Sequence, residues 1–373
     1  MQRKLRLQSK CELLLFVLWP KQNGRIKPFA CIMKRKFLNS LFRLAALGAA
    51  IATVGLPAQA QAPSAEGILV YNAQHASLTQ AWVEAFTKET GIKVTLRQGS
   101  DTELGNQLVQ EGAASPADVF LTENSPAMAL VDGAGLFAPL DPATINLIAP
   151  SYRNAHGRWV GIAARSTVFV YKKTKFTPEQ LPKSLMDLAK PEWKGRWAAS
   201  PAGADFQAIV SAVLELKGEA ATAAWLKGMK ENVVPYKGNS IAMKAVNAGQ
   251  VDGAVIYHYY YYGDMAKTGE NSEKVGLHYF RNEDPGAFVS ISGAGVLASS
   301  KRKAEAQAFV KWVAGKGGQE ILRTGNSYEY AVGQGAASHR SLVPLADLQA
   351  PKVEPAKLNS KKVSDLMTQA GLL

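Results

Sequence analysis

The chain has 373 residues, enough for two domains of ordinary size with a buried core in each. Hydrophobic residues make up 47% of it and charged residues 20%, which excludes a collagen, a disordered chain, a disulfide scaffold and a multi-span membrane protein. The formal net charge of +13 lies mostly before residue 61, where eleven of the 43 basic residues occur beside one acid, and the remaining 32 basic and 29 acidic residues nearly balance.

The first sixty residues carry an export pattern. A basic segment at residues 34–36 precedes the apolar run at residues 44–55, and small residues follow at positions 58 and 60. This order predicts a secretory signal peptide over residues 33–60. The apolar run is shorter than the roughly 20 residues that span a bilayer, so a retained membrane anchor is the weaker interpretation. Because Met33 directly precedes the basic segment, residues 1–32 are predicted to be an over-extended start.

Both cysteines, Cys11 and Cys31, fall within this leader, so residues 61–373 contain none. A disulfide, a thiolate metal site and a cysteine nucleophile are therefore excluded for the mature chain. An exported, cysteine-free and nearly neutral chain of this size indicates the periplasm of a Gram-negative bacterium. A strongly basic surface would be expected of a nucleic-acid binder, so no nucleic-acid partner is predicted.

The mature chain opens with alternating strand and helix patterns. Apolar residues 67–72 predict a buried strand, and a helix follows from an N-cap at Ser77 to a stop at Gly91. Strands that alternate with helices predict a parallel α/β sheet. The next elements predicted are a strand at 92–96, a helix at 102–111, a strand at 117–122 and a helix from Ser125 towards Gly133.

The alternation starts again after residues 193–195. Its clearest unit is a helix at residues 240–248 followed by a strand at residues 251–257, so a second α/β lobe is predicted. Two long β-rich runs, at residues 166–171 and 287–292, are each suited to carry the chain across a hinge between the lobes.

Three of the predicted strands end in residues that can bind a ligand. The first runs into Gln74 and His75, the third into Glu123, and the second-lobe strand into His258 and four tyrosines at residues 259–262. Open α/β sheets bind ligands at the carboxyl ends of their strands, so these groups are expected to face one cleft. Taken singly, a loop histidine or a glutamate near a helix start is more often structural. The tyrosine run cannot all be core, because neighbouring side chains diverge in a strand and in a helix.

Phenolic oxygens indicate one class of cation. The pKa of a free phenol is near 10, so a tyrosine becomes an anionic ligand at neutral pH only where a strong Lewis acid displaces its proton. Hard oxygen ligands with one imidazole favour ferric iron over copper(I) or structural zinc, whereas carboxylates and carbonyls would build a calcium or magnesium site. Two phenolates and a glutamate offset the charge of Fe³⁺.

Along almost all of its mature length the chain resembles the periplasmic ferric-ion-binding proteins of bacterial ABC importers. Residues 70–75 are similar to the opening strand of that family with its ligand histidine, and residues 117–123 to its glutamate-bearing segment. Residues 193–195 and 284–287 resemble further family segments. The resemblance implies an α/β, two-lobed class II periplasmic binding protein fold with two hinge strands and a ligand cleft between the lobes. It implies Fe³⁺ ligands at His75, Glu123, Tyr259 and Tyr260.

The resemblance also implies where the two lobes lie along the chain. The N-terminal lobe is expected at residues 66–166 and 290–340, and the C-terminal lobe at residues 167–289 and 341–373. In this arrangement the histidine and glutamate lie on one lobe and the tyrosine pair on the other, so that the ion itself joins the lobes.

In the family a synergistic anion, such as carbonate or phosphate, completes the coordination of Fe³⁺. Backbone N–H groups at a helix start suit such an anion. Ala202 stands where a serine is expected and Tyr257 where an asparagine is expected, so carbonate, citrate and a weak phosphate site all stay open. A surface salt bridge is the alternative role for the arginine of this site. The resemblance places the anion site at Ala202, Gly203, Ala204 and Asn239, with Arg165 as an additional cation.

The resemblance implies a receptor rather than an enzyme: a monomer that carries ferric ion to an inner-membrane ABC permease with a separate ATPase. The chain itself contains no Gly-x-x-x-x-Gly-Lys-Ser/Thr loop. Two alternatives remain, a receptor for another anionic or amine solute with an aromatic box, and a non-haem iron enzyme, which needs a second histidine. His258 is the nearby candidate, and it points away from the tyrosine pair if the strand continues that far.

Overall fold

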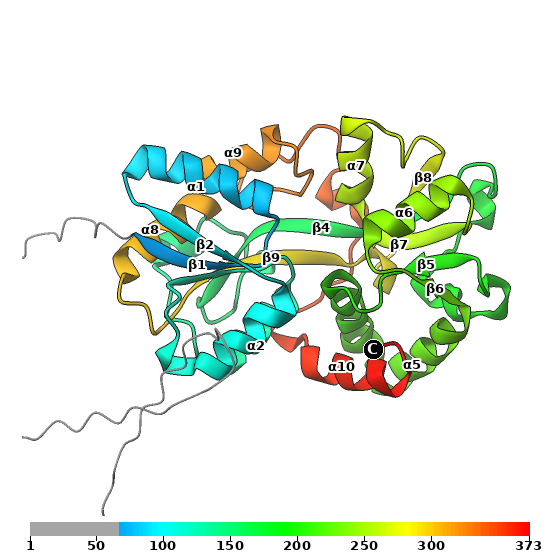
Figure 1. The fold of residues 1–373 in the computed structure, drawn as a ribbon, viewed down its shortest axis with the longest axis horizontal. Coiled ribbons are helices and arrows are strands. Elements are labelled where there is room, and N and C mark those ends of the chain that lie inside the picture. Colours follow the sequence, from blue (N-terminus) through cyan, green and yellow to red (C-terminus); the bar gives the residue numbers. More distant parts are fainter. Residues whose placement is uncertain (1–66) are drawn as a thin grey trace, which may run out of the picture. The chain divides into compact units, whose positions relative to one another are not determined.

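The computed structural model describes residues 67–373, which are drawn in colour in Figure 1. The predicted over-extended start, the signal peptide and both cysteines lie outside these residues. Among the helices of residues 67–373, none has both the length and the apolar character that crossing a membrane would require.

One nine-stranded sheet forms the centre of the fold. Its strands are ordered β2-β1-β3-β9-β4-β7-β5-β6, with β8 paired to β4. The strands are β1 (Ile68–Asn72), β2 (Val94–Gln98), β3 (Val119–Leu121), β4 (Trp159–Lys172), β5 (Trp197–Ala199), β6 (Val233–Pro235), β7 (Gly253–Tyr257), β8 (Val275–His278) and β9 (Val289–Val296).

The sheet contains two parallel parts joined by two long antiparallel strands. β1 pairs in parallel with β2 and β3, and β5 pairs in parallel with β6 and β7, as the alternation of strands and helices predicted. β4 and β9 pair with each other and run between the two parts in Figure 1. β4 pairs with β9 up to Ser166 and with β7 from Thr167 onwards. The lobe boundaries stay a prediction, and the first of them falls at this change of partner.

Helices cover both faces of the sheet. α1, α8 and α9 lie on one face of the part that contains β1, and α2 lies on the other (Figure 1). The long helix α5 packs against α10 and is interrupted at Gly218, whose φ of 77° is left-handed. The helices are α1 (Ala76–Thr90), α2 (Asp101–Glu111), α3 (Ser125–Gly133), α4 (Pro142–Ile145), α5 (Ala204–Asn232), α6 (Asn239–Ala248), α7 (His258–Lys267), α8 (Lys303–Ala314), α9 (Lys316–Thr324) and α10 (Ser360–Gln369).

Local sequence signals explain several element ends. α2 begins with a capping box in which Ser100 and Glu103 satisfy each other's backbone N–H groups. α1 ends at Gly91 in the left-handed conformation, as predicted. The predicted N-cap at Ser77 is wrong: the helix begins at Ala76, which places His75 at the N-cap position. His75 is thereby held at the turn between β1 and α1.

The second-lobe strand is shorter than predicted, and the tyrosine run is helical. β7 spans Gly253–Tyr257 instead of residues 251–257, because the chain first turns back so that the Asp252 N–H donates to Arg196 O. The strand then ends at Tyr257, and His258 is the first residue of α7. The strand does not continue to His258, so the alternation expected of a strand does not apply. Successive side chains from His258 onwards point in directions about 100° apart around a helix.

Candidate metal site

The four side chains predicted to bind a metal lie together. His75 follows β1, Glu123 follows β3, and Tyr259 and Tyr260 lie in the first turn of α7, after β7. His75 Nε2 is 2.9 Å from Glu123 Oε1, and the Tyr259 hydroxyl donates to the same oxygen at 2.8 Å. The ring centroids of Tyr259 and Tyr260 are 4.3 Å apart. The carboxyl ends of strands from both parallel parts thus supply one cluster of imidazole, carboxylate and phenol groups.

A carboxylate that the sequence analysis did not select, Asp205, contacts both phenols. Asp205 lies in the first turn of α5, and the Tyr259 and Tyr260 hydroxyls each lie 3.2 Å from its Oδ2. The Tyr260 hydroxyl donates to this oxygen, and the Tyr259 hydroxyl shares its one proton between this oxygen and Glu123 Oε1. Asn239 Nδ2 donates to Asp205 Oδ2 at 2.8 Å. The sequence did carry a signal, because Asp205 directly follows the segment assigned to the anion. Phenols, amide and carboxylate therefore form one polar group.

The residues assigned to the anion site surround this carboxylate. Gly203 is the N-cap of α5 and Ala204 its first residue, with Ala202 just before them. Asn239 begins α6 and is buried against Asp205. The structure thus places a carboxylate of the chain beside the two helix starts to which the anion was assigned. Whether an exogenous anion binds there stays a prediction.

Arg165 is not a surface residue, so the surface salt bridge weighed in the sequence analysis is wrong. It lies on β4, whose residues from Trp159 to Val170 are buried, and its side chain is fully buried. Its guanidinium forms an ion pair with Glu329, donates to Ser292 Oγ at 2.8 Å, and lies 3.7 Å from Glu123 Oε1. A second nitrogen contact reaches the backbone oxygen of Glu123. The guanidinium of Arg165 therefore lies in the protein interior, where the carboxylates of Glu329 and Glu123 hold it.

Asn124 links the two parts of the site. Its Nδ2 donates to Asp101 Oδ2 and to Asp205 Oδ1, each at 3.1 Å. Its Oδ1 accepts from the Ser290 hydroxyl at 2.7 Å and from the Tyr257 hydroxyl at 3.2 Å. Tyr257 therefore has a hydrogen-bonding role here, although an asparagine was expected at its position. Asn124 follows Glu123 at the end of the third predicted strand, but it is not one of the predicted site residues.

Burial and neighbouring charges shift the acid–base behaviour of the cluster. Burial opposes a charge on His75, but hydrogen bonds to Glu123 and Glu329 outweigh it and raise its pKa to about 10. Burial and the nearby Glu123 raise the pKa of Asp205 to about 6, and burial raises that of Asp101 to about 8. Burial would raise the pKa of Glu123, but Arg165 and His75 lower it.

The phenols of Tyr259 and Tyr260 have raised pKa values and keep their protons at neutral pH. Burial, followed by the negative charges of Asp205 and Glu123, raises the pKa of Tyr259 and of Tyr260 well above the usual value. A cation that binds these oxygens must therefore displace protons from both phenols and from His75. Only a strong Lewis acid gains enough from such ligands to do so, which agrees with the chemistry inferred from the sequence.

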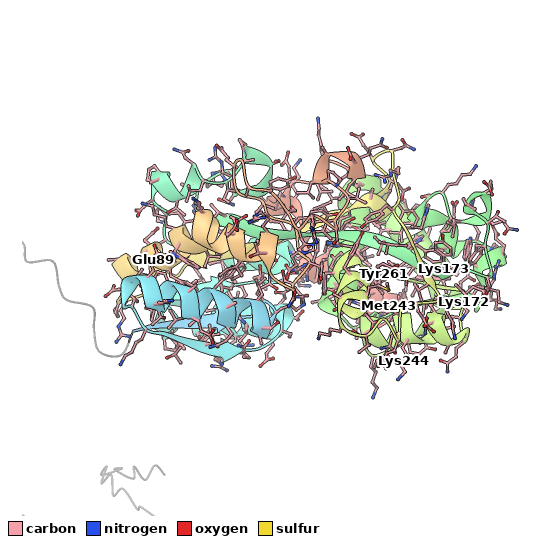
Figure 2. The ribbon with its side chains drawn as sticks, turned by 90° about the horizontal axis from the view of Figure 1, so that it is seen from above. Glu89, Lys172, Lys173, Met243, Lys244 and Tyr261 are labelled. Carbon is pink, nitrogen blue, oxygen red and sulfur yellow. The ribbon has the colours of Figure 1, made fainter. Side chains whose placement is uncertain are left out.

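The remaining aromatic residues of the run lie outside the cluster. His258 is fully buried, its Nδ1 accepts the Ser166 N–H at 3.1 Å, and its ring stacks on Tyr330. Tyr261 packs against an apolar cluster that includes Ala242, Met243 and Val246, and it lies beside Met243 in Figure 2. Within residues 67–373, no three or more His, Cys, Asp or Glu side chains are grouped so as to hold a metal ion.

Comparisons with known proteins identify the family and the fold of the chain. Residues 72–320 match the family of bacterial extracellular solute-binding proteins. The chain is 72% identical over 315 residues to the Fe(3+)-binding periplasmic protein of Serratia marcescens, covering 84% of this chain and 93% of that one. It is 39% identical over 338 residues to the major ferric iron-binding protein of Neisseria meningitidis, covering 90% and 100%. Iron-bound HitA from Pseudomonas aeruginosa superimposes with a TM-score of 0.77 at 41% identity, covering 82% and 99%.

Proposed function

The chain belongs to the bacterial extracellular solute-binding proteins, and we propose that it binds Fe³⁺ in the periplasm as the receptor of an ABC importer. The observation that carries the proposal is the meeting of His75, Glu123, Tyr259 and Tyr260 in one polar cluster. The names of the similar proteins from Serratia and Neisseria support the choice of ferric ion as cargo.

The donor set suits a hard trivalent cation. Tyr259 and Tyr260 supply two phenolates once their protons are displaced, Glu123 supplies a carboxylate, and His75 supplies the imidazole Nε2. These anionic oxygens balance the charge of Fe³⁺, whereas a softer cation would gain less from them. A box for an amine or organic anion is less well supported, because it leaves His75 and Glu123, which contact Tyr259, without a role.

The placement of the ligands gives the receptor a way to respond to its cargo. His75 and Glu123 follow strands of one parallel part of the sheet, whereas Tyr259 and Tyr260 follow β7 of the other. A cation that contacts both pairs of ligands binds more tightly when the two pairs are close together than when they are apart. Ferric ion therefore favours the closed arrangement of the two lobes.

Asp205 bears on the synergistic anion. Its carboxylate already contacts both phenols and Asn239, so it supplies negative oxygens where carbonate or phosphate was expected. An exogenous anion has to displace this carboxylate or bind beside it, and two adjacent anions repel each other. We infer that Asp205 lowers the dependence of iron binding on carbonate or phosphate.

The proposed role involves binding and transfer, without a chemical reaction. The family is one of solute-binding proteins. We infer that the cargo passes from the chain to an inner-membrane ABC permease. We infer that a monomer is sufficient, because the described chain supplies the whole donor set. The export pattern and the periplasmic relative support the periplasmic location.

The test is a titration of metal-free protein with ferric nitrilotriacetate. Phenolate bound to ferric ion absorbs visible light, so we expect a coloured complex that saturates at a single iron per chain. Zinc salt is the control, because Zn²⁺ has no such charge-transfer band. A protein that stays colourless and retains no iron after gel filtration refutes the proposed function.

A further inference from the structure

A buried glutamate far along the chain contacts the ring of His75. Glu329 lies after α9, separated from His75 by 254 residues, and its side chain is fully buried. Its Oε1 is 3.0 Å from His75 Nδ1, while His75 Nε2 faces Glu123 at 2.9 Å. The other oxygen of Glu329 accepts from Gln74 Nε2 at 3.1 Å and pairs with Arg165. The two nitrogens of the imidazole are therefore divided between the two carboxylates.

We propose that Glu329 is a positioning residue for iron binding, which fixes the orientation and tautomer of His75 so that Nε2 is presented to the ferric ion. This inference rests on the proposed function. A histidine that binds a metal through one nitrogen commonly donates its other N–H to a carboxylate, which orients the ring and makes the bound nitrogen more basic. Glu329 is placed to accept the Nδ1–H of His75 in this way.

The backbone alone does not hold the His75 ring. The residue lies at the N-cap of α1 and its side chain makes no capping hydrogen bond. Its backbone N–H donates to Gln74 Oε1 at 2.7 Å, which fixes the main chain but leaves the ring to rotate. About 30% of the side chain is exposed. Glu329 contacts the imidazole from the protein interior and restricts this rotation.

The environment of Glu329 is costly to build, which argues for a role beyond stability. A buried ion pair such as that of Glu329 with Arg165 seldom repays the desolvation of both charges. The preceding residue, Tyr328, has a φ of 55°, a left-handed conformation that is unfavourable for a bulky side chain. Strained backbone of this kind is concentrated at functional sites.

The segment that carries Glu329 is also attached to the helix of the tyrosine ligands. Tyr328 stacks on Tyr262 with ring centroids 6.1 Å apart, and Tyr330 stacks on His258 at 4.7 Å. Tyr262 and His258 both belong to α7, which carries Tyr259 and Tyr260. The backbone of Tyr330 exchanges two hydrogen bonds with Ala164 of β4. Glu329 is thus fixed relative to the phenol ligands as well as to His75.

A double-mutant cycle tests the proposal. Ferric affinities are measured by chelator competition for the wild type, Glu329→Gln, His75→Gln and the double variant. Loss of a carboxylate behind a metal-bound histidine typically weakens binding about 10–100-fold, so we expect that loss for Glu329→Gln alone. In the His75→Gln background the same change should have almost no further effect, because Glu329 acts through His75. Equal losses in both backgrounds, or no loss in either, overturn the proposal.

A second variant and a second readout guard against misfolding. Glu329→Asp keeps the charge beside Arg165 but shortens the reach to His75, so it should keep the fold and still lower the affinity. In protein loaded with diamagnetic Ga³⁺, the His75 Nδ1–H resonance should be present in the wild type and shifted in Glu329→Asp; an unchanged resonance contradicts the positioning role. Asp252→Asn, which removes an ion pair with Arg196 outside the site, is the matched control. A wild type that binds no ferric ion refutes the proposed function instead.

Discussion

Tyr260→Phe removes one phenolic oxygen and leaves the ring in place. The hydroxyl of Tyr260 donates a hydrogen bond to Asp205 Oδ2 at 3.2 Å. That oxygen keeps Tyr259 and Asn239 as donors, so the free energy of unfolding of the metal-free protein should change by no more than ~1 kcal/mol. The ferric complex loses one of its two phenolates. Loss of a residue that hydrogen-bonds a metal ligand already lowers metal affinity about 10–100-fold. Loss of the ligand itself should therefore weaken ferric binding by more than ~100-fold, or about 2.7 kcal/mol.

The run of tyrosines supplies a matched control for this substitution. Tyr261→Phe makes the same chemical change one residue further along α7, where the ring packs against the cluster of Met243. Chelator competition should show a large loss of ferric affinity for Tyr260→Phe and wild-type affinity for Tyr261→Phe. The visible band should weaken and persist in Tyr260→Phe, because Tyr259 still donates. Equal affinity of the two variants, or a large loss in Tyr261→Phe, would show that the tyrosine pair is misassigned.

Three further outcomes are expected. Ferric affinity should fall as the pH is lowered from 7 to about 4, because protons compete with the ion for the phenols of Tyr259 and Tyr260 and for His75. The pKa of His75 is about 10, above neutrality. A constant affinity in chelator competition contradicts these ligands. In the metal-free protein, protonated His75 stabilises the fold because its pKa is raised. This contribution is fully present when the pH is below the ordinary histidine pKa near 6.5, and it is lost as the pH rises through about 10. Denaturant unfolding should therefore show a decline over that range that His75→Gln reduces; a decline of undiminished size would refute the assignment. Asp205→Asn should weaken ferric binding in anion-free buffer, with partial recovery on adding carbonate or phosphate, and affinity that is unchanged in both buffers would remove Asp205 from the site.

Local patterns were sufficient to predict most of the elements near the site. Apolar runs and helix stops placed β1, α1, β3 and α3 to within a few residues, because short-range periodicity and caps determine such elements. The polar residues that interrupt these patterns at the strand ends, His75 and Glu123, stood out for the same reason. The rule that strand ends of an open sheet converge then brought them together with the tyrosine pair.

The course of the chain after Tyr257 was decided by tertiary contacts. A run of four tyrosines is compatible with a strand or a helix, since aromatic residues have only weak helix preferences. In the fold, His258 stacks beneath Tyr330 and accepts a backbone N–H from Ser166 of β4. These contacts come from segments far away in the sequence. They favour a helix that starts at His258 and turns Tyr259 and Tyr260 towards the site.

The amino-acid sequence by itself determined which chemical groups are available and which local segments carry them. The tertiary structure alone decided that Asp205 and Glu329 lie beside the ligands. Glu329 shows no local pattern that marks it, and it meets Arg165 only because β4 and the segment after α9 are brought together in the core. A buried charge persists only where the fold supplies an opposite charge and hydrogen-bond donors, and those partners are fixed by long-range packing rather than by neighbours along the chain.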